Sequence, residues 1–223
     1  MELLANTLFI NLKHRTDRLK HATDEFDKLG IYAERIDAIK HENGAIGCTL
    51  SHIKCLELAK ERDYDCAFIC EDDIEFTNLD LFKENLTKFN SNSKLNWDML
   101  IVGGNNAPPY QQVEDYCARV FYCRTTTGYV VKKHMYDVLI DNFKEGVKLL
   151  TADQTPEGKK KYAIDMYWQR LQYQYYWYMI TPPTVTQYTS YSDIENTTRD
   201  TEGLLLDMTK EWCLPQHLVK SST

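Results

Sequence analysis

The chain has 223 residues, of which 43% are apolar and 26% charged, a globular composition that excludes an intrinsically disordered protein. That length allows one compact domain with a sizeable core. The net charge of −7 excludes a general nucleic-acid-binding surface, because such a surface needs clustered lysine and arginine to displace counterions from phosphates.

Neither end of the chain carries a targeting signal. The N-terminus "MELLANTLFI" has an acidic residue where a signal peptide has basic ones, and the final "KSST" is not a retention signal. No stretch approaches 18 consecutive apolar residues, so no membrane-spanning helix is predicted. The seven cysteines form no CxxC pair, which is typical of reduced thiols. We therefore expect a cytoplasmic protein, or a domain cut from a longer one.

The first half of the chain alternates between strand and helix patterns. "TLFINL" (7–12) predicts a buried strand, and 16–30 predicts a helix that Thr16 caps and Gly30 ends. Further strands are predicted at 31–39, 65–70 and 98–104, and a second helix at 49–62. This order predicts an α/β fold whose central, mostly parallel sheet has helices on its faces.

The second half is less regular. It predicts strands at 117–123 and 126–131, a helix at 132–143, and a polar loop at 149–162 that could act as a lid. The tyrosine- and tryptophan-rich stretch 163–183 fits either the core or a sugar-stacking platform, and aromatic density favours the core. The absence of a repeat or a convincing linker predicts one domain over 1–223.

Three consecutive carboxylates, Glu71, Asp72 and Asp73, follow a buried strand in "FICEDDIEF". Acids at the end of a buried strand cost free energy unless a cation or hydrogen-bond donors meet them. In an extended chain Glu71 and Asp73 point to one side and Asp72 away, an arrangement that suits Mg²⁺ or Mn²⁺ bridging a diphosphate. A solvated turn is the alternative, and spacing alone leaves both open. No P-loop or GxGxxG motif offers another way to bind phosphate.

Cys48, His52 and Cys55 share one helical face, which raises the alternative of a zinc site. The same face carries Leu56 and no fourth ligand follows, so a core stripe is the favoured interpretation.

Two other groups near helix N-termini point to a ligand. Ser51 and His52 lie in the first turns of a predicted helix whose free N–H groups could face an anion. Arg15 and Arg18 lie near another helix N-terminus, where arginine is mildly unfavourable, which favours a ligand-binding role over a surface pair.

Five segments in order resemble the successive signatures of glycosyltransferase family 25, whose members include lipooligosaccharide and procollagen galactosyltransferases. They are "FINLKHRTDR", "ERIDAI", "GAIGCTLSH", "CAFICEDDIEF" and "QYTSYSDIE", spread over about residues 6–196. The resemblance implies a GT-A-type, Rossmann-like fold, a UDP-sugar donor (typically UDP-galactose) and a DxD-type acidic motif holding Mn²⁺ or Mg²⁺. It also implies that the single domain has a donor and metal half (1–104) and an acceptor half (105–223).

The resemblance also implies roles for individual residues. Glu71 and Asp73 would hold the metal, and Asp165, with Asp193 in reserve, would act as the catalytic base on the acceptor side. The residues implied at the donor nucleotide and in its pocket are Asn11, Arg15, Arg18, Asp37, Ser51, His52 and Asp72.

The function predicted on this basis is a metal-dependent, inverting transfer of a hexose (galactose or glucose) from a UDP-sugar to a hydroxyl. The acceptor would be a glycan or a hydroxylysine-containing protein. One alternative is a non-catalytic nucleotide-sugar or glycan binder of the same fold. The other is a different carboxylate-metal enzyme acting on nucleotides, such as a nucleotidyltransferase or pyrophosphatase. The donor sugar, the acceptor and the oligomeric state are left open.

Overall fold

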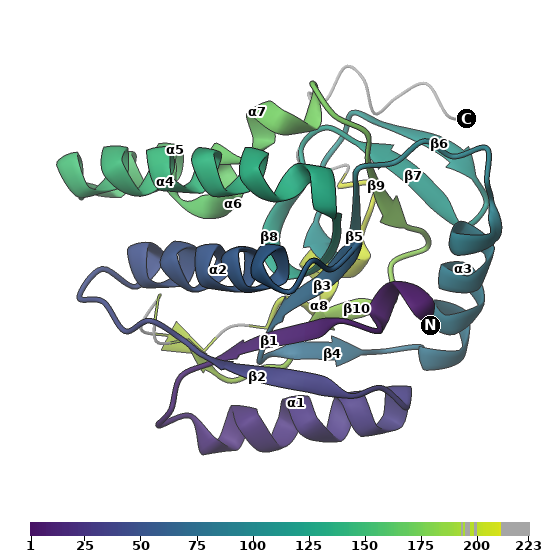
Figure 1. Ribbon diagram of the computed structural model, residues 1–223, viewed down its shortest axis with the longest axis horizontal. Coiled ribbons are helices and arrows are strands. Elements are labelled where there is room, and N and C mark those ends of the chain that lie inside the picture. Colours follow the sequence, from purple (N-terminus) through teal and green to yellow (C-terminus); the bar gives the residue numbers. More distant parts are fainter. Residues whose placement is uncertain (193, 195–196, 199, 211–223) are drawn as a thin grey trace.

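An eight-stranded sheet forms the centre of the molecule (Figure 1). The computed structural model describes residues 1–192, 194, 197–198 and 200–210. The strand order is β2-β1-β3-β8-β5-β9-β7-β6, and the sheet draws strands from both halves of the chain. Its strands are β1 (Thr7–Asn11), β2 (Ala33–Asp37), β3 (Cys66–Glu71), β5 (Met99–Asn105), β6 (Tyr110–Glu114), β7 (Cys117–Val120), β8 (Arg124–Lys132) and β9 (Trp177–Ile180).

The sheet is mixed, but most of its strands run the same way. β1 pairs in parallel with both β2 and β3, and β5 pairs in parallel with β9. β8 runs antiparallel between β3 and β5, and β7 runs antiparallel between β9 and β6. Six of the eight strands therefore share one direction, which confirms the expected α/β class with a mostly parallel central sheet.

Helices cover both faces of the sheet (Figure 1). α2 (Gly44–Glu61) and α4 (Tyr136–Ala152) bury apolar side chains against one face, and α1 (Thr16–Leu29) and α3 (Leu79–Ser91) against the other. No helix in the described part of the chain is long and apolar enough to cross a membrane.

The remaining elements are η1 (Glu2–Leu4), β4 (Ile74–Phe76), η2 (Lys133–Met135), α5 (Pro156–Tyr162), α6 (Ile164–Tyr167), α7 (Gln169–Gln172), β10 (Val185–Gln187), β11 (Tyr191–Ser192), β12 (Thr197–Thr198) and α8 (Glu202–Leu206).

The ends of the first two helices are set by local contacts. Gly30 ends α1 in the left-handed conformation (φ 76°), as predicted. The predicted cap is wrong by one residue, since Arg15 occupies the cap position and its side chain makes no capping hydrogen bond. α2 begins at Gly44, five residues before its predicted start, because the side chain of Asn43 accepts a hydrogen bond from the N–H of Ala45.

The loop predicted at 149–162 is mostly helical, so that prediction is wrong. α4 continues to Ala152, and α5 starts at Pro156 after a link of three residues. Thr155 caps α5 by accepting a hydrogen bond from the N–H of Gly158 at 3.1 Å, and proline suits the first position of a helix. These two local signals outweigh the missing apolar periodicity.

The aromatic stretch divides between the core and the surface. Trp168 and Trp177 are fully buried, and their rings pack edge to face with centroids 5.1 Å apart. Tyr173 and Tyr176 are exposed. The core interpretation therefore holds for the tryptophans but not for every aromatic residue in the stretch.

Candidate functional site

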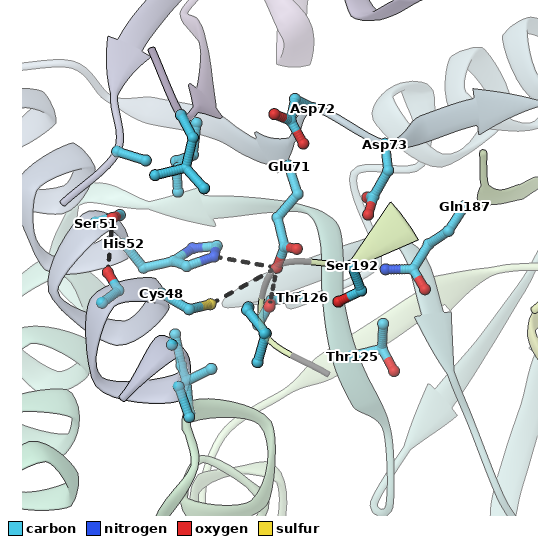
Figure 2. Close-up of a pocket in the computed structure, with 18 of the residues that line it drawn as sticks. Cys48, Ser51, His52, Glu71, Asp72, Asp73, Thr125, Thr126, Gln187 and Ser192 are labelled. Atoms are coloured by element: carbon cyan, nitrogen blue, oxygen red, sulfur yellow. Dashed lines mark hydrogen bonds and ion pairs between the residues drawn. The ribbon is translucent and has the colours of Figure 1, made fainter. Parts of the chain in front are cut away.

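A cavity of about 630 Å³ lies where β3 ends, and the three carboxylates line it (Figure 2). α2 and α6 also contribute to its wall, as do residues from the segment 187–205. This position, at the carboxyl ends of parallel strands, is where ligands collect in open α/β sheets.

The chain turns immediately after Glu71. β3 ends at that residue, and Asp72 and Asp73 form the turn that leads into β4. The expected extended conformation across the three acids is therefore wrong. The side chain of Asp72 also does not point away from that of Asp73. Both reach the same guanidinium nitrogen, because Nη1 of Arg18 lies 3.0 Å from Oδ1 of Asp72 and 3.0 Å from Oδ2 of Asp73.

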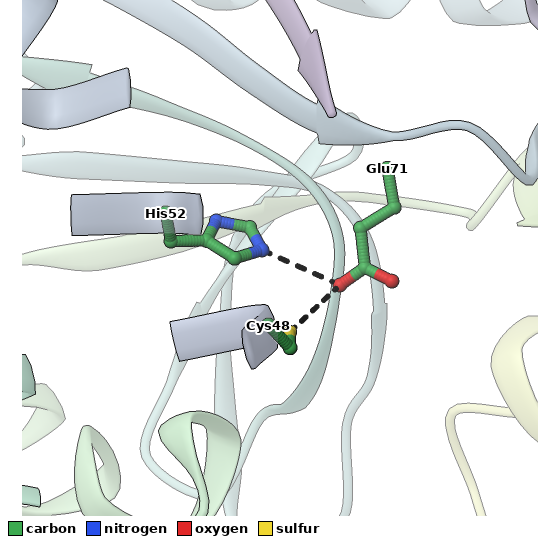
Figure 3. Close-up of side chains that lie close together, drawn as sticks. All are labelled: Cys48, His52 and Glu71. Carbon is green, nitrogen blue, oxygen red and sulfur yellow. Dashed lines mark hydrogen bonds and ion pairs between the residues drawn. The ribbon is translucent and has the colours of Figure 1, made fainter. Parts of the chain in front are cut away.

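One oxygen of Glu71 is held by three donors (Figure 2), of which Figure 3 shows His52 and Cys48. Oε1 accepts from the hydroxyl of Thr126 and lies 3.4 Å from Nε2 of His52 and 4.0 Å from Sγ of Cys48. Burial alone would raise the pKa of Glu71, but the donors His52 and Thr126 outweigh it and hold that pKa below 4.5. Among the described residues none donates to Oε2, so Glu71 can be ionised, fixed in place and still able to bind a ligand.

Asp73 has an oxygen that lacks a partner. Its Oδ1 is buried and makes no hydrogen bond to any described residue. Burial raises the pKa of Asp73 to about 7, the charge of Glu71 adds to this, and Arg18 offsets it only in part. A buried carboxylate oxygen without a partner is costly, and a cation would relieve that cost. The free oxygens of Glu71 and Asp73 therefore fit a hard divalent cation such as Mn²⁺ or Mg²⁺.

Arg15 and Arg18 bring positive charge to the cavity wall and hold the segment that follows β10. Arg18 donates from Nε to Oγ of Ser190 at 3.0 Å and from Nη2 to the carbonyl of Tyr191 at 3.3 Å. Arg15 binds Asp17 through Nε and Nη2, and its Nη1 donates to the same carbonyl of Tyr191 at 2.7 Å. Both arginines are thus placed to meet an anionic ligand.

Two of the residues expected near the nucleotide are not among the described residues that line the cavity. Asn11 is buried; its Nδ2 donates to Oδ2 of Asp72 at 2.7 Å, and its Oδ1 accepts from Arg35 at 2.8 Å. Asn11 therefore fixes the orientation of Asp72. Asp37 is exposed at the end of β2, where it forms an ion pair with Arg35 at 2.8 Å.

Ser51 and His52 line the cavity but already have partners in the protein. The hydroxyl of Ser51 donates to the carbonyl of Gly47 at 2.7 Å and accepts from the N–H of Ile39 at 2.8 Å. It thereby ties the segment after β2 to α2. His52 lies between Glu71 and Tyr129, whose hydroxyl is 3.0 Å from Nδ1.

Asp165 lies in the first turn of α6 and faces the same cavity. Its Oδ2 accepts from the N–H of Thr125 at 3.1 Å, and Thr125 has a left-handed backbone (φ 64°). Burial raises the pKa of Asp165, and the hydrogen bond from Thr125 opposes this only in part. Ala163 occupies the cap position of α6, so a purely capping role for Asp165 is excluded. Asp193 lies outside the described residues.

The sequence of the chain matches a known protein family over half its length. Residues 42–155 match the family model described as glycosyltransferase family 25 (LPS biosynthesis protein). The chain belongs to glycosyltransferase family 25. It is therefore a glycosyltransferase, and the matched residues include the carboxylates and the donors around Glu71. No curated protein sequence matches the chain.

Solved structures show more distant similarity. A glycosyltransferase involved in the glycosylation of the major capsid of PBCV-1 is 13% identical, with a TM-score of 0.43, over 71% of this chain and 73% of that one. A mutant Drosophila beta-1,4-galactosyltransferase 7 in complex with manganese, UDP-Gal and xylobiose is 10% identical, with a TM-score of 0.39, over 96% of this chain and 78% of that one.

The contacts that hold Glu71 have no signature in the sequence. Thr126 and Tyr129 give no signal, because a threonine and a tyrosine in an apolar strand look like ordinary core residues. The sequence does place Cys48 and His52 on one helical face. Their proximity to Glu71 depends on how α2 packs against β3, which no local pattern encodes.

Proposed function

We propose that this glycosyltransferase uses a divalent cation to transfer a hexose from a UDP-sugar to a hydroxyl group, with inversion at the anomeric carbon. The observation that carries the proposal is the unpartnered Oδ1 of Asp73 beside the anchored carboxylate of Glu71. When bound there, Mn²⁺ or Mg²⁺ would supply positive charge that neutralises the leaving diphosphate.

The residues around this pair have separate tasks. Thr126 and His52 hold one oxygen of Glu71, and Asn11 holds Asp72, so the acidic motif is preorganised before any ligand arrives. Arg15 and Arg18 would exchange their present partners for oxygens of the diphosphate, since arginine binds phosphate with two parallel hydrogen bonds.

Asp165 is the candidate general base. It comes from α6, a different segment from the acidic motif, yet lines the same cavity. In the proposed reaction the acceptor oxygen forms a bond to the anomeric carbon, the bond from that carbon to the diphosphate breaks, and UDP leaves. The hydroxyl proton passes to the carboxylate of Asp165. The acceptor would be a hydroxyl of a glycan or of a hydroxylysine side chain.

A donor screen tests the proposal. The thermal midpoint of the protein is measured with a panel of UDP-sugars, with and without Mn²⁺, and transfer is followed as UDP release. A ligand that binds only the native state raises the midpoint by mass action, so we expect a rise that requires both UDP and Mn²⁺. Asp73→Asn should abolish this rise and keep the fold, whereas the exposed Asp141→Asn should behave like the parent. Mn²⁺-dependent UDP binding that survives Asp73→Asn would refute the metal assignment, and UDP-sugar binding without transfer would indicate a non-catalytic binder.

A further inference from the structure

A thiol, an imidazole and a carboxylate meet at the wall of the cavity (Figure 3). Cys48 and His52 lie one turn apart on α2, and Glu71 ends β3. Sγ of Cys48, Nε2 of His52 and a carboxylate oxygen of Glu71 all lie within 4.8 Å of one another. The zinc alternative weighed from the sequence used Cys55, but that residue is fully buried in the core, and Glu71 takes its place as the third group.

The spacing of these atoms is close to that of a metal site. Zinc binds sulfur at about 2.3 Å and nitrogen or oxygen at about 2.0–2.2 Å, so tetrahedral geometry separates the ligand atoms by roughly 3.3–3.6 Å. The nitrogen-to-oxygen distance between His52 and Glu71 is 3.4 Å, and the sulfur-to-oxygen distance between Cys48 and Glu71 is 4.0 Å. The sulfur of Cys48 and the nitrogen of His52 lie within 4.8 Å of each other, so side-chain shifts of up to about 1 Å would bring the three atoms around one ion.

The chemistry of the three groups selects a different kind of ion from the carboxylate pair. Thiolate and imidazole favour Zn²⁺ and Co²⁺, whereas Mg²⁺ prefers oxygen. We propose that Cys48, His52 and Glu71 form a second cation site, selective for thiophilic divalent cations, which shares Glu71 with the oxygen site of the proposed function. Its fourth position faces the cavity and would hold water or a ligand oxygen.

Tyr129 supports the change that metal binding requires in His52. With Nε2 protonated toward Glu71, the imidazole accepts a hydrogen bond from the Tyr129 hydroxyl at Nδ1. When Nε2 binds a metal, the proton moves to Nδ1, which then donates to the same oxygen. A hydroxyl serves in both states because it donates and accepts. The thiol of Cys48 would lose its proton to the solvent as the metal binds.

Sharing Glu71 couples the two sites. Two cations on one carboxylate repel each other, so an occupied thiolate site should weaken binding at the oxygen site, and the effect must be reciprocal. Thiophilic cations would then inhibit the transfer. This consequence rests on the proposed function, but the existence of the thiolate site does not.

Cobalt gives a direct readout of the site. The full chain is titrated with Co²⁺, and a sulfur-to-cobalt charge-transfer band in the near ultraviolet is followed, with Zn²⁺ added to displace the cobalt. We expect the band in the parent, its loss in Cys48→Ser, and its retention in Cys66→Ser, which changes a half-buried cysteine outside the cavity wall. Absence of the band in the parent, or an unchanged band in Cys48→Ser, would overturn the proposal.

A second pair of variants leaves the three ligand residues themselves unchanged. Tyr129→Phe should weaken Zn²⁺ binding by about 10- to 100-fold, the usual effect of losing an outer hydrogen-bond partner of a ligating histidine. Tyr136→Phe removes another buried tyrosine hydroxyl, one that donates to the carbonyl of Tyr64, and should leave Zn²⁺ affinity unchanged. Equal Zn²⁺ affinity in both variants would count against the site. Mn²⁺-dependent UDP binding, measured alongside, reports separately on the proposed function.

Discussion

Arg18 lies in contact with Asp73, its Nη1 3.0 Å from Oδ2, and the same nitrogen is 3.0 Å from Oδ1 of Asp72. Burial lowers the pKa of Arg18, but the charges of Asp73 and Asp72 outweigh it and the pKa rises. One guanidinium thus compensates only part of the charge of two largely buried carboxylates, in the place where the proposed function puts a cation and a diphosphate. In the absence of ligand, Arg18 stabilises the acidic motif; on donor binding it would turn to the phosphates.

Arg18→Gln should therefore lower both stability and donor affinity. Removing one partner of a buried ion pair costs about 3–5 kcal/mol, because a buried charge is left uncompensated. Mn²⁺ should restore much of the lost thermal midpoint, since it supplies the missing charge. UDP-sugar affinity should fall by roughly 1.5–3 kcal/mol, measured by calorimetry, as a charge-assisted hydrogen bond is lost.

The matched control for Arg18 is Arg62→Gln, which removes an arginine paired with Glu34 at the surface and should change little. If Arg18→Gln and Arg62→Gln had the same midpoint and the same UDP affinity, Arg18 would have no special role in the motif.

The titration of Asp73 predicts how stability varies with pH. Its pKa is raised from 3.8 to about 7 in the native protein, so between these values the native state binds more protons than the unfolded state. The free energy of unfolding should then decrease as pH rises from about 4 to about 7 on account of this residue, and level off above. Mn²⁺ binding should weaken below pH 7, because a proton competes with the ion.

Asp73→Asn carries no titrating group at this position, so this part of the pH slope should disappear. Thermal midpoints of the parent, Asp73→Asn and the exposed Asp141→Asn, measured without metal across this pH range, provide the test. Parallel curves for the parent and Asp73→Asn would show that Asp73 titrates near its ordinary value.

The central strands could be predicted from sequence because their apolar runs end in turn residues. β1, β3 and β5 follow this pattern, and the sequence predicts all three. It also predicts β2, β7 and β8, although β2 is mostly polar and β8 leads directly into a helical turn. β9 is not predicted, because it begins at Trp177 inside an aromatic stretch with no alternation. At α5 the sequence predicts a loop, because only the capping residues, and no apolar stripe, specify this helix.

In the candidate site, too, the residues marked by a local sequence pattern could be predicted, and the contacts that depend on packing could not. Glu71, Asp72 and Asp73 could be predicted because they directly follow a buried strand, and Arg18 because its charge is unfavourable at a helix N-terminus. The contact of His52 with Glu71 could not be predicted, because it joins residues 19 apart through the packing of α2 on β3. The hydrogen bond between Thr125 and Asp165 joins residues 40 apart, and it could not be predicted either.

Gly47 should be required for the wall of the cavity. A Cβ at this position would lie 2.6 Å from the carbonyl oxygen of Ile39, a backbone atom that cannot move without displacing the segment after β2. Gly47→Ala should therefore destabilise the protein by about 1–3 kcal/mol, as overpacking does, and also weaken UDP-sugar binding. Gly203→Ala is the control, since nothing lies within 4 Å of its added carbon. Equal thermal midpoints for the two variants would show that the wall can adapt.

Asp165→Asn should separate turnover from binding. The asparagine oxygen can still accept the hydrogen bond from Thr125, so the left-handed turn at Thr125 should persist and the cavity should keep its shape. An amide cannot take a proton from the acceptor hydroxyl, so turnover should fall by a factor on the order of 10²–10⁴ with UDP-sugar affinity almost unchanged. The raised pKa of Asp165 fits this role, because a stronger base accepts the proton more readily. Single-turnover transfer and calorimetric donor binding distinguish the outcomes. Donor affinity that falls in proportion to turnover would place Asp165 at the donor or metal, and no change in either quantity would leave it a purely structural contact of Thr125.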